Sequence, residues 1–230
     1  MLECKKLKIS NGDIKLLDIS FKLNGSLSLV GQSGSGKSLT LKAVLGLLPK
    51  SLKCEIDLKS DFELSLGENV AFIPQNPFTA LSPMTKISKQ FFASEVKQKE
   101  CISMVGLDEE LLERFPAELS GGQLQRVIIA MAIAQNPKLL MLDEPTTALD
   151  FDTKEKIIAL LEKLHEEMGF EILFVTHELF LAKRLCKECV VLKKRCIIES
   201  GSAEKLFKAP SNAYTKALID VEFERRSFRQ

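Results

Sequence analysis

The sequence predicts an α/β fold in which a parallel or mixed sheet is covered by helices and interrupted by a helical insertion. Three observations predict it. Short apolar runs bounded by turn residues recur along the chain. Amphipathic helical patterns fall between these runs, and the stretch 76–136 shows helical and loop patterns only. Alternating strand and helix patterns are typical of a sheet buried between layers of helices.

The strand-like runs are hydrophobic at most or all positions, as expected for strands covered on both faces. They are "LSLV" before Gly31, "NVAFIP" at 69–74, "LLML" at 139–142, "EILFVT" at 171–176 and "CVVLKK" at 189–194.

Helical patterns lie between the predicted strands. One runs from Leu39 to Leu48 and is closed by Pro49. Another runs from Lys154 to Met168, carries an apolar stripe and ends before the helix breaker Gly169. The polar tail contains one further helix-like piece, "NAYTKALIDVEFERR".

The segment between Pro74 and Pro137 interrupts the alternation of strands and helices. We therefore predict an α/β core at 1–75 and 137–205, with a helical subdomain at 76–136. Residues 206–230 are expected to form a short C-terminal extension.

Bulk composition narrows the class of protein. The 32 basic and 31 acidic residues leave a net charge of +1, which gives no electrostatic case for nucleic-acid binding. The longest uncharged apolar run, 127–134, is far shorter than the ~20 residues that cross a bilayer. The N-terminus lacks the apolar centre of a secretory signal. We expect a soluble, cytoplasmic protein.

Six cysteines are scattered along the chain, and the segment "CKECVVLKKRC" has the CxxC spacing of some zinc and iron–sulfur sites. No second CxxC and no nearby histidine completes a set of four ligands. Reduced structural thiols are therefore favoured over the alternative of a metal site.

The segment "GQSGSGKS" fits the pattern G-x-x-x-x-G-K-[ST], and it lies between an apolar strand and a helix. Its glycines let backbone N–H groups surround a polyphosphate at the positive end of the helix. Lys37 is expected to reach the β- and γ-phosphates, and the Ser38 hydroxyl to ligate magnesium. The pattern predicts a RecA-like P-loop NTPase core. The expected nucleotide contacts are Gly31, Gln32, Ser33, Gly34, Ser35, Gly36, Lys37, Ser38 and Leu39.

The segment "LLMLDEP" places two carboxylates, Asp143 and Glu144, directly after a buried strand. Open α/β sheets bind ligands at this carboxyl edge of the strands. We expect Asp143 to hold the magnesium and Glu144 to activate the attacking water as general base. Solvated acidic caps at a strand end are the alternative, which the upstream P-loop disfavours.

A second glycine-rich loop, "LSGGQ", opens another helix. Ser120 and Gln123 have the spacing of a capping box, but capping does not require the glycine pair Gly121 and Gly122. Two glycines leave the first N–H groups of the helix uncovered for close approach. Because the P-loop already serves one nucleotide, we infer that this loop contacts a nucleotide carried by another subunit.

Six motifs occur in one order: "GQSGSGKS", Gln75 in "AFIPQNP", "LSGGQ", "LLMLDE", "TALD" ending at Asp150, and "VTH" ending at His177. With them the chain resembles the nucleotide-binding subunits of ATP-binding cassette (ABC) transporters over essentially its whole length. The resemblance implies an ATPase that pairs head to tail, as a homodimer or with a second ATP-binding subunit. Each ATP is then expected between the P-loop of one subunit and the "LSGGQ" signature of the other, with Asp150 in the adjoining D-loop.

The resemblance also implies the remaining roles. Gln75 is expected to sense magnesium and the γ-phosphate and to contact a membrane partner, and His177 to contact the γ-phosphate and Glu144. The expected catalytic residues are Glu144, His177 and Gln75, and the expected magnesium ligands are Ser38, Gln75 and Asp143. The implied cofactors are ATP and Mg²⁺. The implied partners are membrane permease subunits and, indirectly, an extracytoplasmic substrate-binding protein, which places the chain on the cytoplasmic side of the cell membrane.

The segments "PQNPFTALSPMTKI" and "APSNAYTKAL" resemble importers for peptides and nickel. Many peptide members continue with a further cysteine-containing segment, whereas this chain stops soon after Leu218. That difference favours nickel or another metal chelate as cargo, with a peptide as the alternative.

The chain departs from the family pattern at the position expected to contact the adenine base. Asn11 stands where such domains usually place a stacking aromatic residue, and no tryptophan or tyrosine lies nearby. Phe21 has the strand context of a core residue, and His165 lies on a polar helix face without an assigned role.

Two other classes of function remain open. An ABC-type ATPase could act on DNA or ribosomes, but DNA-repair members separate P-loop and signature by a long coiled coil. Here only about eighty residues intervene, without a heptad run. Ribosomal members carry two cassettes in one chain. A regulator without turnover is disfavoured by the presence of Lys37, Glu144 and His177.

Overall fold

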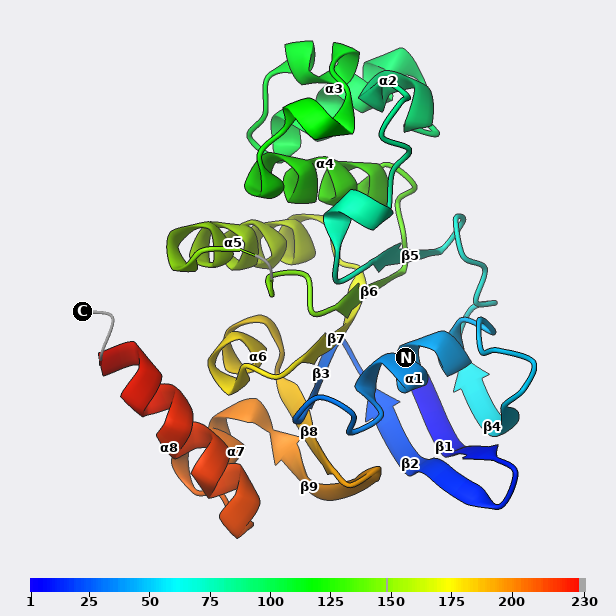
Figure 1. The fold of residues 1–230 in the computed structure, drawn as a ribbon, viewed down its shortest axis with the longest axis vertical. Coiled ribbons are helices and arrows are strands. Elements are labelled where there is room, and N and C mark those ends of the chain that lie inside the picture. The colour runs from blue at the N-terminus through cyan, green and yellow to red at the C-terminus, as the bar shows by residue number, and fades with distance from the viewer. Residues whose placement is uncertain (148, 228–230) are drawn as a thin grey trace. The chain divides into compact units, whose positions relative to one another are not determined.

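The computed structural model describes residues 1–147 and 149–227, and the side chains of residues up to 223 in the last helix (Figure 1). The chain divides into two compact units. The first unit contains residues 1–64 and 171–230, and the second contains residues 65–170.

The strands of the first unit, among its described residues, belong to two sheets. Its strands are β1 (Leu2–Asn11), β2 (Ile14–Leu23), β3 (Ser26–Val30), β4 (Lys53–Ser60), β7 (Glu171–Thr176), β8 (Glu188–Lys193) and β9 (Cys196–Ser202). Strands β7, β3, β8 and β9 lie side by side in that order, with β3 parallel to β7 and β8, and β9 antiparallel to β8. All five residues of β3 are buried, which explains why its sequence is uninterrupted by charge. The predicted mixed sheet is confirmed.

The second sheet of this unit is antiparallel and has the order β2-β1-β4. Residues of β1 alternate between buried and exposed, and most of β4 is exposed. A sheet with one solvated face produces this half-polar pattern. No apolar run marks β1 or β4 in the sequence, so the strand pattern does not predict them.

The described residues of the first unit also form the helices α1 (Lys37–Val44), α6 (Leu179–Leu185), α7 (Ala203–Lys208) and α8 (Ala213–Ser227). Helix α1 begins two residues before the predicted start and ends four residues early. The reason for the early end is Gly46, whose φ of 68° leaves the helical conformation and allows it to donate to the carbonyl of Ala43.

The second unit holds the parallel strands β5 (Val70–Ile73) and β6 (Leu139–Asp143). Between them the chain forms helices only, as predicted for 76–136. These are the 3₁₀ helices η1 (Pro77–Thr79), η2 (Glu109–Glu113) and η3 (Pro116–Glu118), and the α-helices α2 (Ile87–Gln90), α3 (Glu95–Met104) and α4 (Gly121–Ile133).

Helix α5 (Phe151–Met168) follows β6 in the second unit. It buries Ile157, Ile158, Leu161 and Leu164. The predicted apolar stripe also included Leu160, which is only half-buried. The helix ends at Gly169, as predicted, and starts earlier than predicted because the Asp150 carboxylate accepts the backbone N–H of Thr153. None of the helices among the described residues is both long and apolar enough to span a membrane.

Candidate nucleotide-binding and catalytic site

The P-loop joins the buried strand β3 to helix α1. The tip of the loop, 32–34, is exposed, whereas Ser35 and Lys37 are 6% and 4% exposed. Lys37 Nζ donates to the carbonyl oxygens of Gly31 at 2.7 Å and Gln32 at 3.2 Å. The lysine therefore lies inside the curl of its own loop, where its charge faces the concave side.

The glycines of the P-loop are required by its backbone. Gly34 and Gly36 have φ values of 77° and 107°, which disfavour residues with a side chain. A Cβ on Gly36 would lie 2.5 Å from the side chain of Leu17, and one on Gly31 would overlap the carbonyl oxygen of Leu192. The loop therefore keeps its curled path only with glycine at these positions.

The polar groups of this loop fit a phosphate ligand. Ser35 Oγ is buried and has no hydrogen-bond partner among the described residues. A buried hydroxyl without a partner is costly unless a ligand or water completes it. A hydroxyl donor, a buried ammonium group and a helix N-terminus are groups with which proteins bind anions, so the loop has the chemistry of the predicted phosphate site.

His177 lies beside the P-loop in the same unit. Strands β3 and β7 are parallel, and Val30 pairs with Thr176 in their register. Gly31 and His177 therefore follow paired residues at the carboxyl ends of neighbouring strands. This edge of a parallel sheet is where ligands bind.

The second unit brings Gln75, Asp143 and Glu144 together. Ile73 of β5 pairs with Leu142 of β6, so Gln75 and the acid pair leave the sheet side by side. Gln75 Nε2 lies 3.5 Å from Glu144 Oε2, and Asp143 is only 8% exposed.

The backbone of Glu144 is in an unusual conformation, with φ at 46°. A non-glycine residue in this region is strained, and such strain persists where the surroundings hold the residue in place. Thr147 contributes to that hold, because its Oγ1 donates to Glu144 Oε2 at 3.0 Å. The backbone conformation of Glu144 and the hydrogen bonds from Gln75 and Thr147 thus set the direction of its carboxylate.

The "LSGGQ" loop forms the predicted capping box at the start of α4. Ser120 Oγ accepts the N–H of Gln123 at 3.2 Å, and Gln123 Oε1 accepts the N–H of Ser120 at 3.0 Å. Ser120 is exposed, and Gly121 and Gly122 are partly so. The loop is accessible to a second molecule.

Gly122 also has a packing role that the sequence did not reveal. A Cβ at this position would lie 2.7 Å from Cγ2 of Thr153 in α5. Thr153 is held by Asp150, which accepts both its N–H at 2.9 Å and its hydroxyl at 2.7 Å. The predicted D-loop aspartate therefore fixes the residue that packs against the signature glycine. Ala148 of the D-loop lies outside the described residues.

The predicted site residues thus form three groups: the P-loop with His177, the acid pair with Gln75, and the signature with Asp150. The first group belongs to the first unit and the others to the second. Sequence reasoning missed Thr147 and Thr153. The spacing of Asp150 and Thr153, an acidic residue followed three positions later by a polar one at a helix start, was a usable signal.

The structure also describes the surroundings of Phe21, Asn11 and two of the cysteines. Phe21 is 6% exposed and belongs to the core. Asn11 is exposed at the end of β1, opposite Ile14. Cys186 and Cys189 are buried, and burial raises the pKa of Cys189 to about 11 and the pKa of Cys186 well above its ordinary value. Such cysteines are protonated at neutral pH and inert, as expected for structural thiols.

A P-loop beside a histidine at one sheet edge, with an acid pair after a second buried strand, defines a nucleotide-binding P-loop ATPase. The sequence pattern of the ABC transporter family matches residues 14–147, more than half of the chain. The chain belongs to the ABC transporter family and is an ATPase cassette of that family.

Relatives and solved structures agree with this assignment. The chain is 34% identical over 253 residues to the oligopeptide transport ATP-binding protein OppD of Bacillus subtilis, covering 95% of this chain and 71% of that protein. It is 38% identical to the peptidoglycan transport ATP-binding protein YejF of Agrobacterium fabrum, covering 85% of this chain but only 41% of that protein. A bacterial ABC transporter cassette solved as a dimer superposes with a TM-score of 0.74 at 29% identity, covering 88% of this chain and 99% of the other.

Proposed function

We propose that this chain hydrolyses ATP to drive an importer for peptides or similarly small cargo. The observation that carries the proposal is the pairing of Val30 with Thr176, which sets the P-loop and His177 at adjacent strand ends. A phosphate held by Lys37 would then lie within reach of a histidine that follows the next strand. This arrangement suits a nucleotide whose γ-phosphate is both bound and sensed.

The residues present suit a magnesium ion beside the phosphates. Ser38, Gln75 and Asp143 would hold it through hydroxyl, amide and carboxylate oxygens, the ligands that magnesium prefers. When bound, the ion neutralises charge on the β- and γ-phosphates. The proposal therefore includes that the P-loop and the acid pair bind the same nucleotide.

Glu144 is proposed as the general base. Its carboxylate accepts hydrogen bonds from Gln75 and Thr147, and these two contacts orient it. A carboxylate oriented in this way can take a proton from an attacking water. His177 would contact both the γ-phosphate and Glu144 and so keep the two correctly placed for the reaction.

We propose that the signature loop completes the site of a second ATP-binding subunit. Its exposed Ser120 and the glycine N–H groups face outward at a helix N-terminus, where an anion is stabilised. The superposable cassette described above was solved as a dimer. A homodimer and a heterodimer both satisfy this requirement.

The helical subdomain, proposed at 76–136, presents a face suited to a membrane permease. Four large apolar side chains in it are highly exposed: Phe78 at 54%, Met84 at 85%, Phe92 at 90% and Val96 at 79%. We propose that these exposed side chains take part in the surface that contacts the permease.

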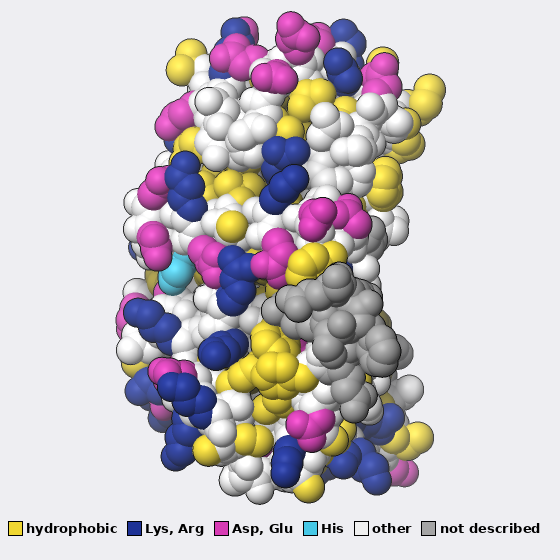
Figure 2. Space-filling view, turned by 90° about the vertical axis from the view of Figure 1, so that its left-hand side faces the viewer, with side chains coloured by type: hydrophobic (Ala, Val, Ile, Leu, Met, Phe, Trp, Pro, Cys, Tyr) yellow, Lys and Arg dark blue, Asp and Glu magenta, His cyan; other side chains and the backbone are white. Residues whose placement is uncertain are grey.

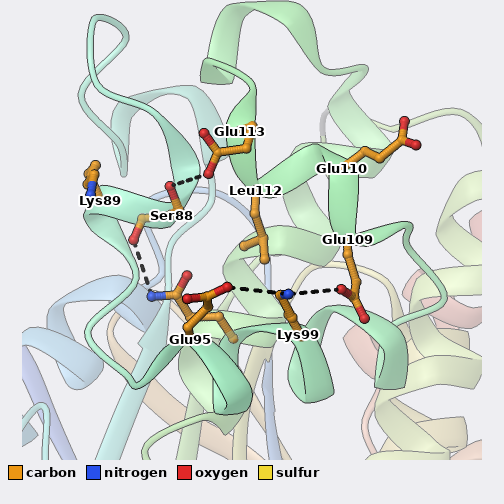
Figure 3. A pocket seen from close by; sticks show the side chains of 9 residues that line it. Ser88, Lys89, Glu95, Lys99, Glu109, Glu110, Leu112 and Glu113 are labelled. Carbon is orange, nitrogen blue, oxygen red and sulfur yellow. Dashed lines mark hydrogen bonds and ion pairs between the residues drawn. The ribbon is translucent and has the colours of Figure 1, made fainter.

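A pocket of ≈ 460 Å³ lies in the same subdomain (Figure 3). Lys99 ion-pairs with Glu95 at 3.3 Å and Glu109 at 3.6 Å, and Glu110 and Glu113 add two further carboxylates. The lining carries four carboxylates and two lysines, Lys89 and Lys99. Glu113 also pairs at 2.9 Å with Lys86, which lies outside the lining. We propose that the occupant is a cytoplasmic helix of a permease that carries apolar residues and a basic one.

The cargo is proposed from the relatives. Their names refer to peptidoglycan, oligopeptide and dipeptide transport and to glutathione import. We therefore propose a peptide, taken from an extracytoplasmic binding protein, and keep nickel as the alternative. A role on DNA or ribosomes is disfavoured, because 32 basic and 31 acidic residues leave a net charge of only +1. On the face shown in Figure 2, basic side chains lie among acidic ones.

The decisive experiment combines turnover with crosslinking. The purified chain should hydrolyse ATP with magnesium, and turnover should rise in vesicles that contain its permease subunits. Single cysteines at Met84 and Phe92 should crosslink to the permease, whereas a cysteine at the exposed Ile14 of the first unit should not. Crosslinks from Ile14 alone would contradict the docking face, and absence of magnesium-dependent turnover would contradict the ATPase.

A further inference from the structure

The C-terminal helix caps the helix that follows His177. Glu222 of α8 accepts the backbone N–H of Leu179 through Oε1 at 2.5 Å and of Phe180 through Oε2 at 3.0 Å. These two donors are the first residues of α6, and the carboxylate comes from more than forty positions away in the sequence.

Helix α6 makes no such cap from its own N-terminus. Glu178 occupies the N-cap position, yet its side chain makes no capping hydrogen bond. Its backbone N–H donates instead to Oγ1 of Thr176 at 3.0 Å. Three successive N–H groups after His177 are therefore fixed by side chains, one by the end of β7 and two by Glu222.

Helix α8 is held firmly enough to position this carboxylate. Ile219 is 5% exposed and belongs to a buried cluster with Leu179 and Leu206. Phe223 packs edge-on against Phe180, with ring centroids 4.9 Å apart. Because positions 219, 222 and 223 share one helix face, the packing that buries Ile219 also aims Glu222 at α6.

At the other end of α8, Glu199 of β9 accepts the N–H groups of Ser211 at 2.6 Å and Asn212 at 3.3 Å. Tyr214, the tyrosine of the "APSNAYTKAL" tail, makes a cation–π contact with Lys193. The Lys193 Nζ lies 4.3 Å from the centroid of the tyrosine ring. The tail motif therefore docks α8 onto the sheet.

We propose that Glu222 is a positioning residue for His177, acting through the backbone of 178–180. A carboxylate at a helix N-terminus satisfies two N–H donors and interacts favourably with the helix dipole. Without it, the first turn of α6 frays and the preceding histidine loses a fixed direction. The inference rests on the proposed role of His177 in contacting the γ-phosphate.

The test compares three variants in steady-state ATPase assays and ATP-binding titrations. Glu222→Ala should lower kcat about tenfold and leave ATP affinity within about twofold, because the P-loop is untouched. Glu222→Gln keeps one acceptor oxygen and should show a smaller loss. Glu204→Ala, which removes an exposed carboxylate paired with Lys208 on α7, is the control and should keep wild-type turnover.

A double-mutant cycle with His177→Ala shows whether Glu222 affects kcat through His177. If Glu222 acts through His177, Glu222→Ala causes no further loss of kcat in the His177→Ala background. Equal losses in both backgrounds would overturn the proposal. So would a parallel fall of kcat and ATP affinity in Glu222→Gln, the variant that remains informative if Glu222→Ala does not fold.

Amide hydrogen exchange separates this inference from the proposed ATPase function. Exchange at Leu179 and Phe180 should accelerate in Glu222→Ala and Glu222→Gln but not in Glu204→Ala. Unchanged exchange overturns the cap even when the wild-type chain is an active ATPase. A wild-type chain without turnover overturns the ATPase, while the exchange data still report on the cap.

Discussion

Gln75 Nε2 contacts Glu144 Oε2 at 3.5 Å, although the two residues lie 69 positions apart in the sequence. Their strands, β5 and β6, are parallel neighbours, so both residues emerge at the same sheet edge. A residue expected to sense magnesium thus touches the expected base directly. A shift of Gln75 would change the orientation of the Glu144 carboxylate, which offers a physical route from subdomain movement to catalysis.

Glu144→Gln should abolish turnover and preserve ATP binding. The amide keeps the shape and the contact with Gln75 but cannot take a proton, so we expect kcat to fall on the order of 10²–10⁴-fold. Magnesium-dependent phosphate release and ATP titration measure the two quantities, and gel filtration with ATP should show a retained dimer. Lys37→Ala is the control, which should lose ATP binding itself. Undiminished turnover in Glu144→Gln would refute the assigned base.

Ser120→Arg should leave ATP binding to the monomer nearly intact and abolish hydrolysis. The signature contributes nothing to the chain's own proposed site, but the larger side chain blocks closure over the partner's nucleotide. ATP titration of the monomer and ATPase assays at dimer-forming concentration separate the two. Wild-type turnover would show that "LSGGQ" is only a helix cap.

Mixing Ser120→Arg with Lys37→Ala chains tests the head-to-tail arrangement. One interface of the mixed dimer combines an intact P-loop with an intact signature, and the other combines both defects. Activity should reappear on mixing if the chain pairs with itself and one working site suffices. If the native pair is a heterodimer, the second subunit replaces one of the chains in the same experiment.

Gly122→Ala should destabilise the fold for a reason unrelated to nucleotide. Its Cβ would overlap Cγ2 of Thr153, and overpacking of this kind costs about 1–3 kcal/mol. Urea unfolding measures the loss. Thr153→Ser removes the methyl group but keeps the hydroxyl that Asp150 accepts, so Gly122→Ala in this background should cost less than about 0.5 kcal/mol. An equal cost in both backgrounds would contradict the packing explanation.

The chain should discriminate weakly between ATP and GTP. Asn11 stands where the family usually has a stacking aromatic, and a stack contributes on the order of 1–3 kcal/mol per base where it has been measured with nucleic acids. Competition titrations give the ratio of the two affinities, and Asn11→Tyr should increase both. A strong preference for ATP in the unmodified chain would mean that another residue covers the base.

Stability should fall at acidic pH through Glu199. Burial alone raises the pKa of this carboxyl, but hydrogen bonds from residues at the start of α8, including Ser211, outweigh it and leave the pKa below 4.5. A carboxylate whose pKa is lower in the folded than in the unfolded state stabilises the fold at pH values above the unfolded-state pKa. This stabilisation is lost as the pH falls through the folded-state pKa. Glu199→Gln should be less stable by about 1 kcal/mol near neutral pH, and the difference should shrink below pH 4.5. A constant difference across this range would contradict the assignment.

The sequence by itself determined the order of the motifs and the elements that carry them. Strand β3 is apolar at most positions, Gly34 and Gly36 permit the turn that follows, and Ser120 with Gln123 caps α4. Each of these features depends on neighbours within a few positions, so a local pattern is enough to predict it.

The tertiary structure alone decided the contacts that join distant segments. Gly122 is glycine partly because Thr153 packs against it, and the start of α6 is capped by Glu222 of the last helix. Strand β4 is mostly polar and forms because β1 offers it an edge. These interactions are set by the packing of whole elements, and side chains far apart in the sequence leave no periodic signal that would reveal their contact.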